Sequence, residues 1–84
     1  MKLSVKIQNP EKVVFQGDVA ALSSINERGK FDVLPEHANF LSIIQNEIIL
    51  HKLDGKTETL KIEQGILRVQ LDRVDIFLGL TSPI

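Results

Sequence analysis

Hydrophobic and polar residues alternate along most of the chain, the pattern of strands with one buried face. At the start, Leu3, Val5 and Ile7 fall on one side of an extended segment, with polar residues between them. The alternation recurs as far as residue 78, and no segment carries a long apolar repeat of about 3.6 residues, as an amphipathic helix would. The expected strands are residues 2–8, 13–15, 19–25, 31–33, 41–44, 47–51, 57–63, 67–71 and 74–78.

Short polar segments with Gly, Pro or Asn separate these strands. Residues 9–12 (Asn-Pro-Glu-Lys) form the first turn, and residues 26–30 (Asn-Glu-Arg-Gly-Lys) predict an exposed hairpin loop. Pro35 predicts one helical or irregular turn over residues 35–39, because proline lacks the N–H that a central strand requires. Asp54 and Gly55 give the strongest hairpin signal. Further breaks are expected at residues 45–46, 64–65 and 72–73.

These segments predict an all-β fold, an antiparallel β-sandwich or flattened barrel of about ten short strands. The chain has 84 residues, which suffices for one small domain, so we expect residues 1–84 to form a single domain. Its only aromatic residues of the Phe, Trp and Tyr group are four Phe, so the core should be aliphatic.

Some strands carry apolar residues on both faces, which a two-layer sandwich alone does not require. Examples are residues 43–44, 48–50 and 76–78. Scattered exposed aliphatic residues are common on protein surfaces, and this is one explanation. The other is that several gather on one sheet and mark a protein interface.

Composition limits the classes of function. The net charge is −1 and no long block of one sign occurs, so bulk charge attracts neither nucleic acid nor an anionic membrane. The absence of cysteine excludes disulfides, thiolate metal sites and a cysteine nucleophile. The first residues lack the apolar run of a signal peptide, and no apolar stretch is long enough to span a membrane, so the expected location is cytoplasmic.

No pattern indicates catalysis or a bound cofactor. The two histidines, His37 and His51, have neither the spacing nor the companion residues of a zinc site or of a nucleophilic triad. The glycines are isolated between strands and do not form a phosphate-binding loop. We therefore expect no catalytic residue, no cofactor and no metal, and a binding or structural module.

Three segments, in order, resemble the epsilon subunit family of F-type ATP synthases. Residues 9–17 (Asn-Pro-Glu-Lys-Val-Val-Phe-Gln-Gly) are similar to the family's Thr-Pro-Glu-x-x-x-Phe-x-Gly opening. Residues 31–41 (Phe-Asp-Val-Leu-Pro-Glu-His-Ala-Asn-Phe-Leu) resemble its Phe-Gly-Ile-Leu-Pro-x-His-Ala-Pro-Leu-Leu stretch. Residues 64–69 (Gln-Gly-Ile-Leu-Arg-Val), followed by residues 74–76, resemble Gly-Gly-x-Leu-Glu-Val with Val-x-Val.

The resemblance implies a ten-stranded sandwich in the central stalk, without catalysis of its own. Such a domain contacts the gamma subunit and the ring of c subunits, and couples ring rotation to ATP synthesis on other chains. It is held indirectly at the cytoplasmic face of the bacterial inner membrane. By position in the family motifs, the c-ring contacts are Glu27, Arg28, Gly29 and Lys30, and the gamma contacts are Asn9, His37 and Ser42.

The sequence also departs from the family. Lys30 stands where an acidic residue is common, so either Glu27 substitutes for it or this c ring carries an acidic loop. Asp32 and Asn39 replace the usual Gly and Pro. The family's C-terminal helical hairpin has no counterpart before Ile84, so we expect no inhibition of ATP hydrolysis through it.

Two other readings remain open at this point. One is a free-standing β-sandwich that binds a small ligand or a peptide and shares only the fold. The other is a small hydrolase, which would require His37 to meet a Ser or an Asp in one pocket.

Overall fold

The computed structural model of the chain describes residues 1–79, and within them it forms seven β-strands and no helix. The expected all-β fold is therefore confirmed, whereas the expectation for the end of the chain lies outside the described residues. The strands are β1 (Leu3–Gln8), β2 (Val13–Val19), β3 (Ala21–Asn26), β4 (Gly29–Val33), β5 (Phe40–His51), β6 (Thr57–Gln70) and β7 (Arg73–Leu78).

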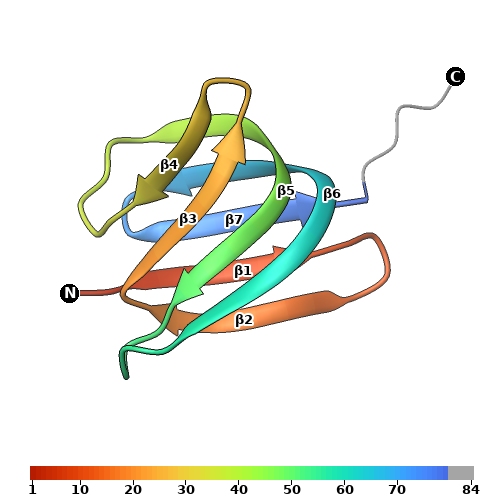
Figure 1. The fold of residues 1–84 in the computed structure, drawn as a ribbon. Coiled ribbons are helices and arrows are strands. Elements are labelled where there is room, and N and C mark those ends of the chain that lie inside the picture. The colour runs from red at the N-terminus through yellow and green to blue at the C-terminus, as the bar shows by residue number, and fades with distance from the viewer. Residues whose placement is uncertain (80–84) are drawn as a thin grey trace, which may run out of the picture.

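All seven strands belong to one sheet, in the order β2-β1-β7-β6-β5-β3-β4, and the sheet folds over on itself (Figure 1). β1, β2 and β7 lie side by side in one layer, while β3 and β4 lie in the other. The long strands β5 and β6 curve from the first layer into the second, so a single sheet provides both layers of the sandwich (Figure 1).

The sheet is antiparallel, as expected, except at one strand pair. β1 and β7 run parallel, with Val5 opposite Val74 and Ile7 opposite Ile76. β7 reaches this place by a tight turn from β6, after the chain has passed through both layers. Parallel neighbours cannot be joined by a tight turn, and here the connection from β1 to β7 includes all the strands from β2 to β6. Local turn signals alone therefore cannot indicate this pair.

The expected number of strands, about ten, was too high because two expected turns are bends within continuous strands. Gln45 pairs with Gln64, whereas Glu47 pairs with Lys61, so β6 contains one residue more than β5 between these pairs. This is a β-bulge, which lets paired strands turn a corner without leaving the sheet. Asn46 adopts a left-handed backbone conformation (φ 75°) at the corner.

The bulge also changes which residues of β6 face the core. Before it, Leu60 and Ile62 pack against the core, and after it Gly65, Leu67 and Val69 are buried. Even-numbered positions thus point inward on one side of the corner and odd-numbered positions on the other. The extra residue keeps apolar side chains inside the sandwich in both layers.

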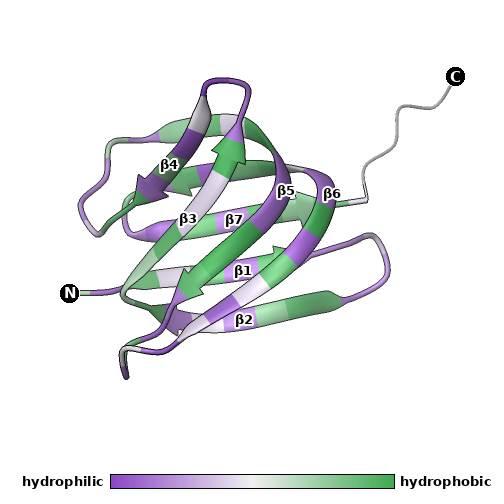
Figure 2. Cartoon of the chain, in the orientation of Figure 1, coloured by the Kyte–Doolittle hydropathy of each residue, from purple (hydrophilic) through white to green (hydrophobic). Residues whose placement is uncertain are grey.

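The core between the layers is aliphatic, as expected, and its strands alternate hydrophobic and hydrophilic residues (Figure 2). Phe15, Phe31 and Phe40 pack at its margin and are only partly buried. The fully enclosed residues come from both layers: Leu3, Val5, Ile7, Val19, Leu22, Val33, Ile44, Ile48, Leu50, Leu67, Val69, Val74 and Ile76.

Residues 34–39 form an irregular turn, in agreement with the sequence prediction, and it is tied to the β6–β7 turn. The backbone N–H of Glu36, itself at φ 67°, donates to Asp72 Oδ1 at 2.7 Å. Asn39 Oδ1 accepts a hydrogen bond from the N–H of Leu71 at 3.2 Å. The turn is therefore fixed beside the start of β7.

Candidate protein-binding surface

The outer side of β5, β6 and β7 carries apolar side chains that no part of residues 1–79 covers completely. Ile43 lies opposite Ile66, and Ile66 lies opposite Phe77, so the three form a row across the sheet. Leu41 stands two residues from Ile43 on the same side of β5. Leu41 and Ile43 are 68% and 61% exposed, and Ile66 and Phe77 are half-buried. We call these four residues the apolar face.

The local sequence explains why the apolar face exists. In β5, Ser42 and Ile44 point inward, so strand alternation turns Leu41 and Ile43 outward. This resolves the double apolar pattern at residues 43–44, since Ile44 is buried in the core while Ile43 is on the surface. Leu41 and Ile43 do gather on this part of the sheet, whereas the other exposed large hydrophobic residues are scattered, so each of the two explanations applies to part of the apolar surplus.

A group of charged residues borders the apolar face. Asp75 of β7 is only 6% exposed, although it lies on the outer side of the sheet. Arg68 covers it, with Nη2 at 2.9 Å from Asp75 Oδ2, and the Arg68 guanidinium also stacks over the Phe77 ring at 5.9 Å from its centroid. Arg73 Nε lies 3.8 Å from the same carboxylate oxygen, and Lys6 of β1 is paired in register with Asp75.

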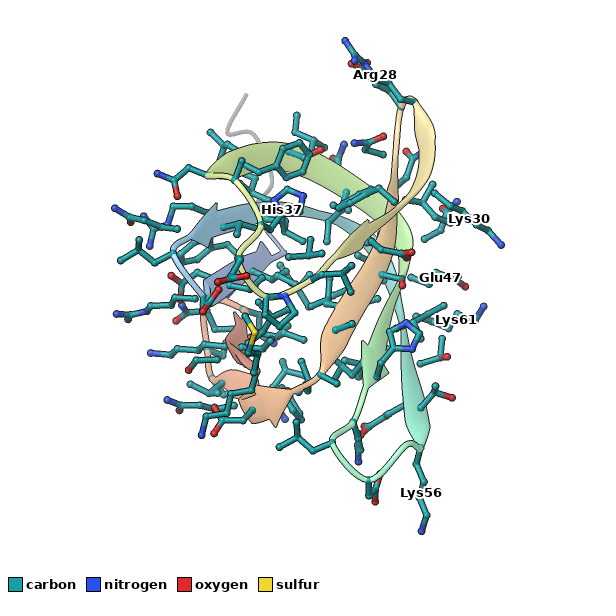
Figure 3. The ribbon with its side chains drawn as sticks, turned by 90° about the vertical axis from the view of Figure 1, so that its left-hand side faces the viewer. Arg28, Lys30, His37, Glu47, Lys56 and Lys61 are labelled. Carbon is teal, nitrogen blue, oxygen red and sulfur yellow. The ribbon has the colours of Figure 1, made fainter. Side chains whose placement is uncertain are left out.

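A hollow of about 630 Å³ lies next to the apolar face, between β5 and the tip of the β3–β4 hairpin. Leu41 and Ile43 line one side of it, and Glu27 and Arg28 line the other. Figure 3 shows Arg28 at the outermost point of the hairpin. The apolar face therefore continues into a recess that a protruding segment of another protein can enter.

The four residues predicted to contact the c ring form this hairpin, but they do not all point the same way. Glu27 and Arg28 make the turn, and Gly29 begins β4 with φ 110°, a conformation that favours glycine. Asn26 Oδ1 accepts a hydrogen bond from the Arg28 N–H at 2.9 Å and fixes the turn. Lys30 extends from the side of the hairpin, on the same side of the molecule as Glu47 and Lys61 (Figure 3).

The three residues predicted to contact gamma lie in separate places. Asn9 follows β1, and its Oδ1 accepts hydrogen bonds from the N–H groups of Glu11 and Lys12 at 2.8 and 2.9 Å. His37 lies beside the β6–β7 turn, with its ring 5.6 Å from that of Phe40. Because β1 and β7 are parallel, Asn9 and His37 lie beyond opposite ends of strands that span about 20 Å.

Ser42 is the one of the three that borders the hollow. Its hydroxyl accepts a hydrogen bond from Asn26 Nδ2 at 3.1 Å and donates to the carbonyl oxygen of Ile43. The structure thus brings Ser42 together with Glu27 and Arg28, two residues predicted to bind a different partner.

A histidine does meet a serine and an aspartate, but it is His51 rather than His37. Ser23 Oγ donates to Asp32 Oδ1 at 2.6 Å, so its oxygen accepts from the Nε2–H of His51, 2.8 Å away. A histidine that donates to serine cannot take the serine proton as a general base. His37 shares a shallow hollow with Asp72 whose lining contains no serine. The described residues therefore offer no hydrolase triad at either histidine.

Sequence reasoning did not identify most of the apolar face or its charged border. The alternation at residues 41–43 and 74–78 carried part of the signal, because it separates inward from outward positions. It could not show that Phe77 and Lys6 belong to neighbouring strands, since that pairing joins distant parts of the chain.

Comparison with known proteins places this geometry in a family. Residues 2–79 match the model of the ATP synthase delta/epsilon chain β-sandwich domain. The ATP synthase epsilon chain of Nitratiruptor sp. is 41% identical over 68 residues, covering 80% of this chain and 53% of that relative. The epsilon chain of Wolinella succinogenes is 35% identical over 75 residues, covering 88% of this chain and 57% of that relative. The chain thus spans little more than half the length of these relatives.

Solved structures agree on the fold. A chain of the Euglena gracilis mitochondrial ATP synthase, in a structure of OSCP, F1 and the c-ring, superposes with a TM-score of 0.87 at 20% identity and covers 98% of this chain. A chain from the central stalk and c-ring of the Tetrahymena thermophila mitochondrial ATP synthase gives a TM-score of 0.74 at 9% identity and 93% coverage. This chain covers 53% and 63% of those two chains. By the match of its residues 2–79, the protein belongs to the family of ATP synthase delta/epsilon chain β-sandwich domains.

Proposed function

We propose that the domain is a central-stalk part of an F-type ATP synthase that couples rotation of the c ring to the gamma subunit. In this role it carries no catalytic residue and no cofactor, and the ion gradient drives ATP synthesis on other chains. The observation that carries the proposal is the exposed apolar face beside the β3–β4 hairpin, in a domain of this family.

The apolar face supports a lasting contact with another protein. Burial of exposed Leu41 and Ile43 is favourable at about 25 cal/mol for each Å² removed from water. Patches of this kind on a small domain mark interaction sites. We assign gamma to this face, with Ser42 at its edge. Asn9 and His37 lie at two ends of the same layer, so they reach gamma only if its surface extends along β1 and β7.

The tip of the β3–β4 hairpin is the proposed contact with the c ring. Arg28, which makes the turn together with Glu27, projects at the outermost point of the hairpin (Figure 3), which suits a contact with a separate partner. Gly29 gives the turn its shape, and Lys30 places a positive charge at the side of the hairpin. An acidic group on the ring is its expected counterpart.

Membrane association in this proposal is indirect, through the ring, on the cytoplasmic side of a bacterial inner membrane. Among residues 1–79, no helix is long and apolar enough to cross a membrane.

The test is binding to the gamma subunit of the same organism, measured by calorimetry. Ile43→Asp places a charge in the centre of the apolar face and should weaken binding at least about tenfold. Leu53→Asp is the matched control, because Leu53 is similarly exposed but lies in the β5–β6 turn. The control should bind like the unchanged chain.

A folded chain that fails to bind gamma would contradict the proposal and favour the alternative of a free-standing ligand- or peptide-binding module. Equal loss of binding in the two variants would also contradict it, because the contact would then not involve the apolar face.

A further inference from the structure

We propose that the segment of gamma which covers the apolar face carries carboxylates that pair with Lys6 and Arg73. This inference rests on the proposed function and adds the chemical character of the partner. Lys6 and Arg73 belong neither to the family motifs nor to the apolar face, and this inference gives both of them a role in recognising gamma.

The charges beside the apolar face do not balance. Arg68 and Arg73 contact one carboxylate, that of Asp75, and Lys6 lies opposite Asp75 in register. Arg68 makes the short contact of 2.9 Å, so most of the Asp75 charge is satisfied by Arg68, whereas Arg73 stands at 3.8 Å. Lys6 forms no ion pair with any residue in the range 1–79.

The register places Lys6 and Arg73 on the same side of the sheet as the apolar row. Phe77 lies opposite Gln8 on β1, and Lys6 is two residues from Gln8 on the same side of that strand. Two residues along a strand correspond to about 7 Å, so the Lys6 backbone is that far from the row. On β7, Arg73 lies two residues beyond Asp75 and four residues from Phe77, which belongs to the row. Arg73 is well exposed, with 72% of its side chain accessible.

A partner that covers the apolar row and extends along β1 and β7 therefore approaches both cations. Removing a cation from water without an opposite charge is costly, so a favourable partner surface presents acidic groups there. Such pairs at the border of an interface fix orientation and increase the association rate more than they increase affinity. The matching partner is a protein segment with an apolar stripe and carboxylates along one edge.

The shape of the site favours a protein segment over a membrane surface, although both can be apolar and acidic. Ile43 lines a recess whose opposite wall is formed by Glu27 and Arg28. Arg28 stands at the outermost point of the hairpin (Figure 3), and a flat bilayer cannot follow the surface from this tip into the recess. A protein side chain can enter the recess.

The experiment measures gamma binding by the unchanged chain and by the double variant Lys6→Gln with Arg73→Gln, at low and at high ionic strength. Two exposed ion pairs predict a loss of affinity of about 2- to 30-fold at low salt. High salt should weaken the unchanged chain and bring its affinity near that of the variant. The association rate should fall more than the dissociation rate rises.

The matched control is Lys56→Gln with Lys61→Gln, which changes the net charge equally at sites away from the apolar face (Figure 3). It should retain the affinity and salt dependence of the unchanged chain. Arg68 is left intact in all variants because it satisfies the buried Asp75 carboxylate. The single variant Lys6→Gln serves as a second test if the change at Arg73 disturbs folding.

The outcomes separate the two proposals. If Ile43→Asp abolishes binding but the Lys6 and Arg73 variant binds like the unchanged chain at every salt concentration, the charge proposal is overturned and the proposed function stands. If the unchanged chain does not bind gamma at all, both fail. If the variant loses only binding to phosphatidylglycerol vesicles and keeps its gamma affinity, the basic residues serve a membrane surface and the charge proposal is overturned.

Discussion

Gly65 is the position where the contact between β6 and β7 allows no side chain, and Gly65→Ala tests how closely the two strands pack beneath the apolar face. Gly65 pairs with Leu78 on one side and with Ile44 on the other. An added Cβ would lie 2.8 Å from Leu78 Cδ2 and 3.0 Å from the carbonyl oxygen of Phe77. The leucine methyl group can move aside, but the carbonyl oxygen is part of the sheet backbone.

The expected magnitude is a balance of two effects. Adding a methyl group to a closely packed site typically costs about 1–3 kcal/mol. Replacing glycine by alanine at an unstrained backbone position recovers about 0.4–1 kcal/mol through the unfolded chain. The net loss in the free energy of unfolding lies between about 0 and 2.6 kcal/mol, with a midpoint of about 1.3 kcal/mol, which for a domain of this size lowers Tm by roughly 5–10 °C.

Urea unfolding, followed by far-ultraviolet circular dichroism, measures this difference. The matched control is Gly17→Ala in the edge strand β2, where an added Cβ meets only the Phe15 ring, at 3.4 Å. The control should be neutral or slightly stabilising. Equal stability of the Gly65 and Gly17 variants would refute the reasoning, because it would show that β6 and β7 have room for a side chain.

Three further predictions concern the strand ends and the ion pairs. Leu71 is 78% exposed at φ 57°, where a β-carbon is strained, so Leu71→Asn should leave Tm unchanged or raise it; a clear fall would contradict the assigned conformation. Asp75→Asn removes the charged hydrogen bond from Arg68 and should lower the free energy of unfolding by about 1–3 kcal/mol in urea titration; an unchanged value would show that the pair adds no stability. The Glu58 carboxylate, hydrogen-bonded to Lys52, raises the pKa of that ammonium above 10.5. The ion pair between Lys52 and Glu58 therefore stabilises the folded state at neutral pH, and this contribution disappears as pH rises through the folded-state pKa of Lys52. Glu58→Gln should lower this pKa in an NMR titration, and an unchanged pKa would exclude Glu58 as the cause.

The sequence predicted most strands of the fold but not their continuity. Gln45 and Asn46 look like a turn because both are polar and Asn tolerates a left-handed conformation, yet in the structure they form the corner of β5. Gln64 and Gly65 look like a break for similar reasons. A bulge and a turn share the same residue preferences, and only the pairing across the strands distinguishes them.

The binding surface was predictable only in outline. The doubled apolar pattern at residues 43–44 left two explanations open, scattered exposure or a covered outer side, and Ile43 is indeed exposed. Phe77 and Lys6 could not be added to this surface, because the parallel pairing of β1 with β7 depends on the folding of the whole chain. The placement of Ser42 next to Glu27 has the same origin, since it requires β5 to pass the tip of the β3–β4 hairpin.

The most direct test of the central claim uses the absence of cysteine from the sequence. A single thiol introduced by Ile43→Cys can be labelled with a maleimide in the free chain and in the presence of gamma, with Leu53→Cys as the control. The account predicts that gamma slows labelling strongly at position 43 and leaves position 53 unchanged. Equal labelling rates at position 43 with and without saturating gamma would contradict the assignment of the apolar face to this partner.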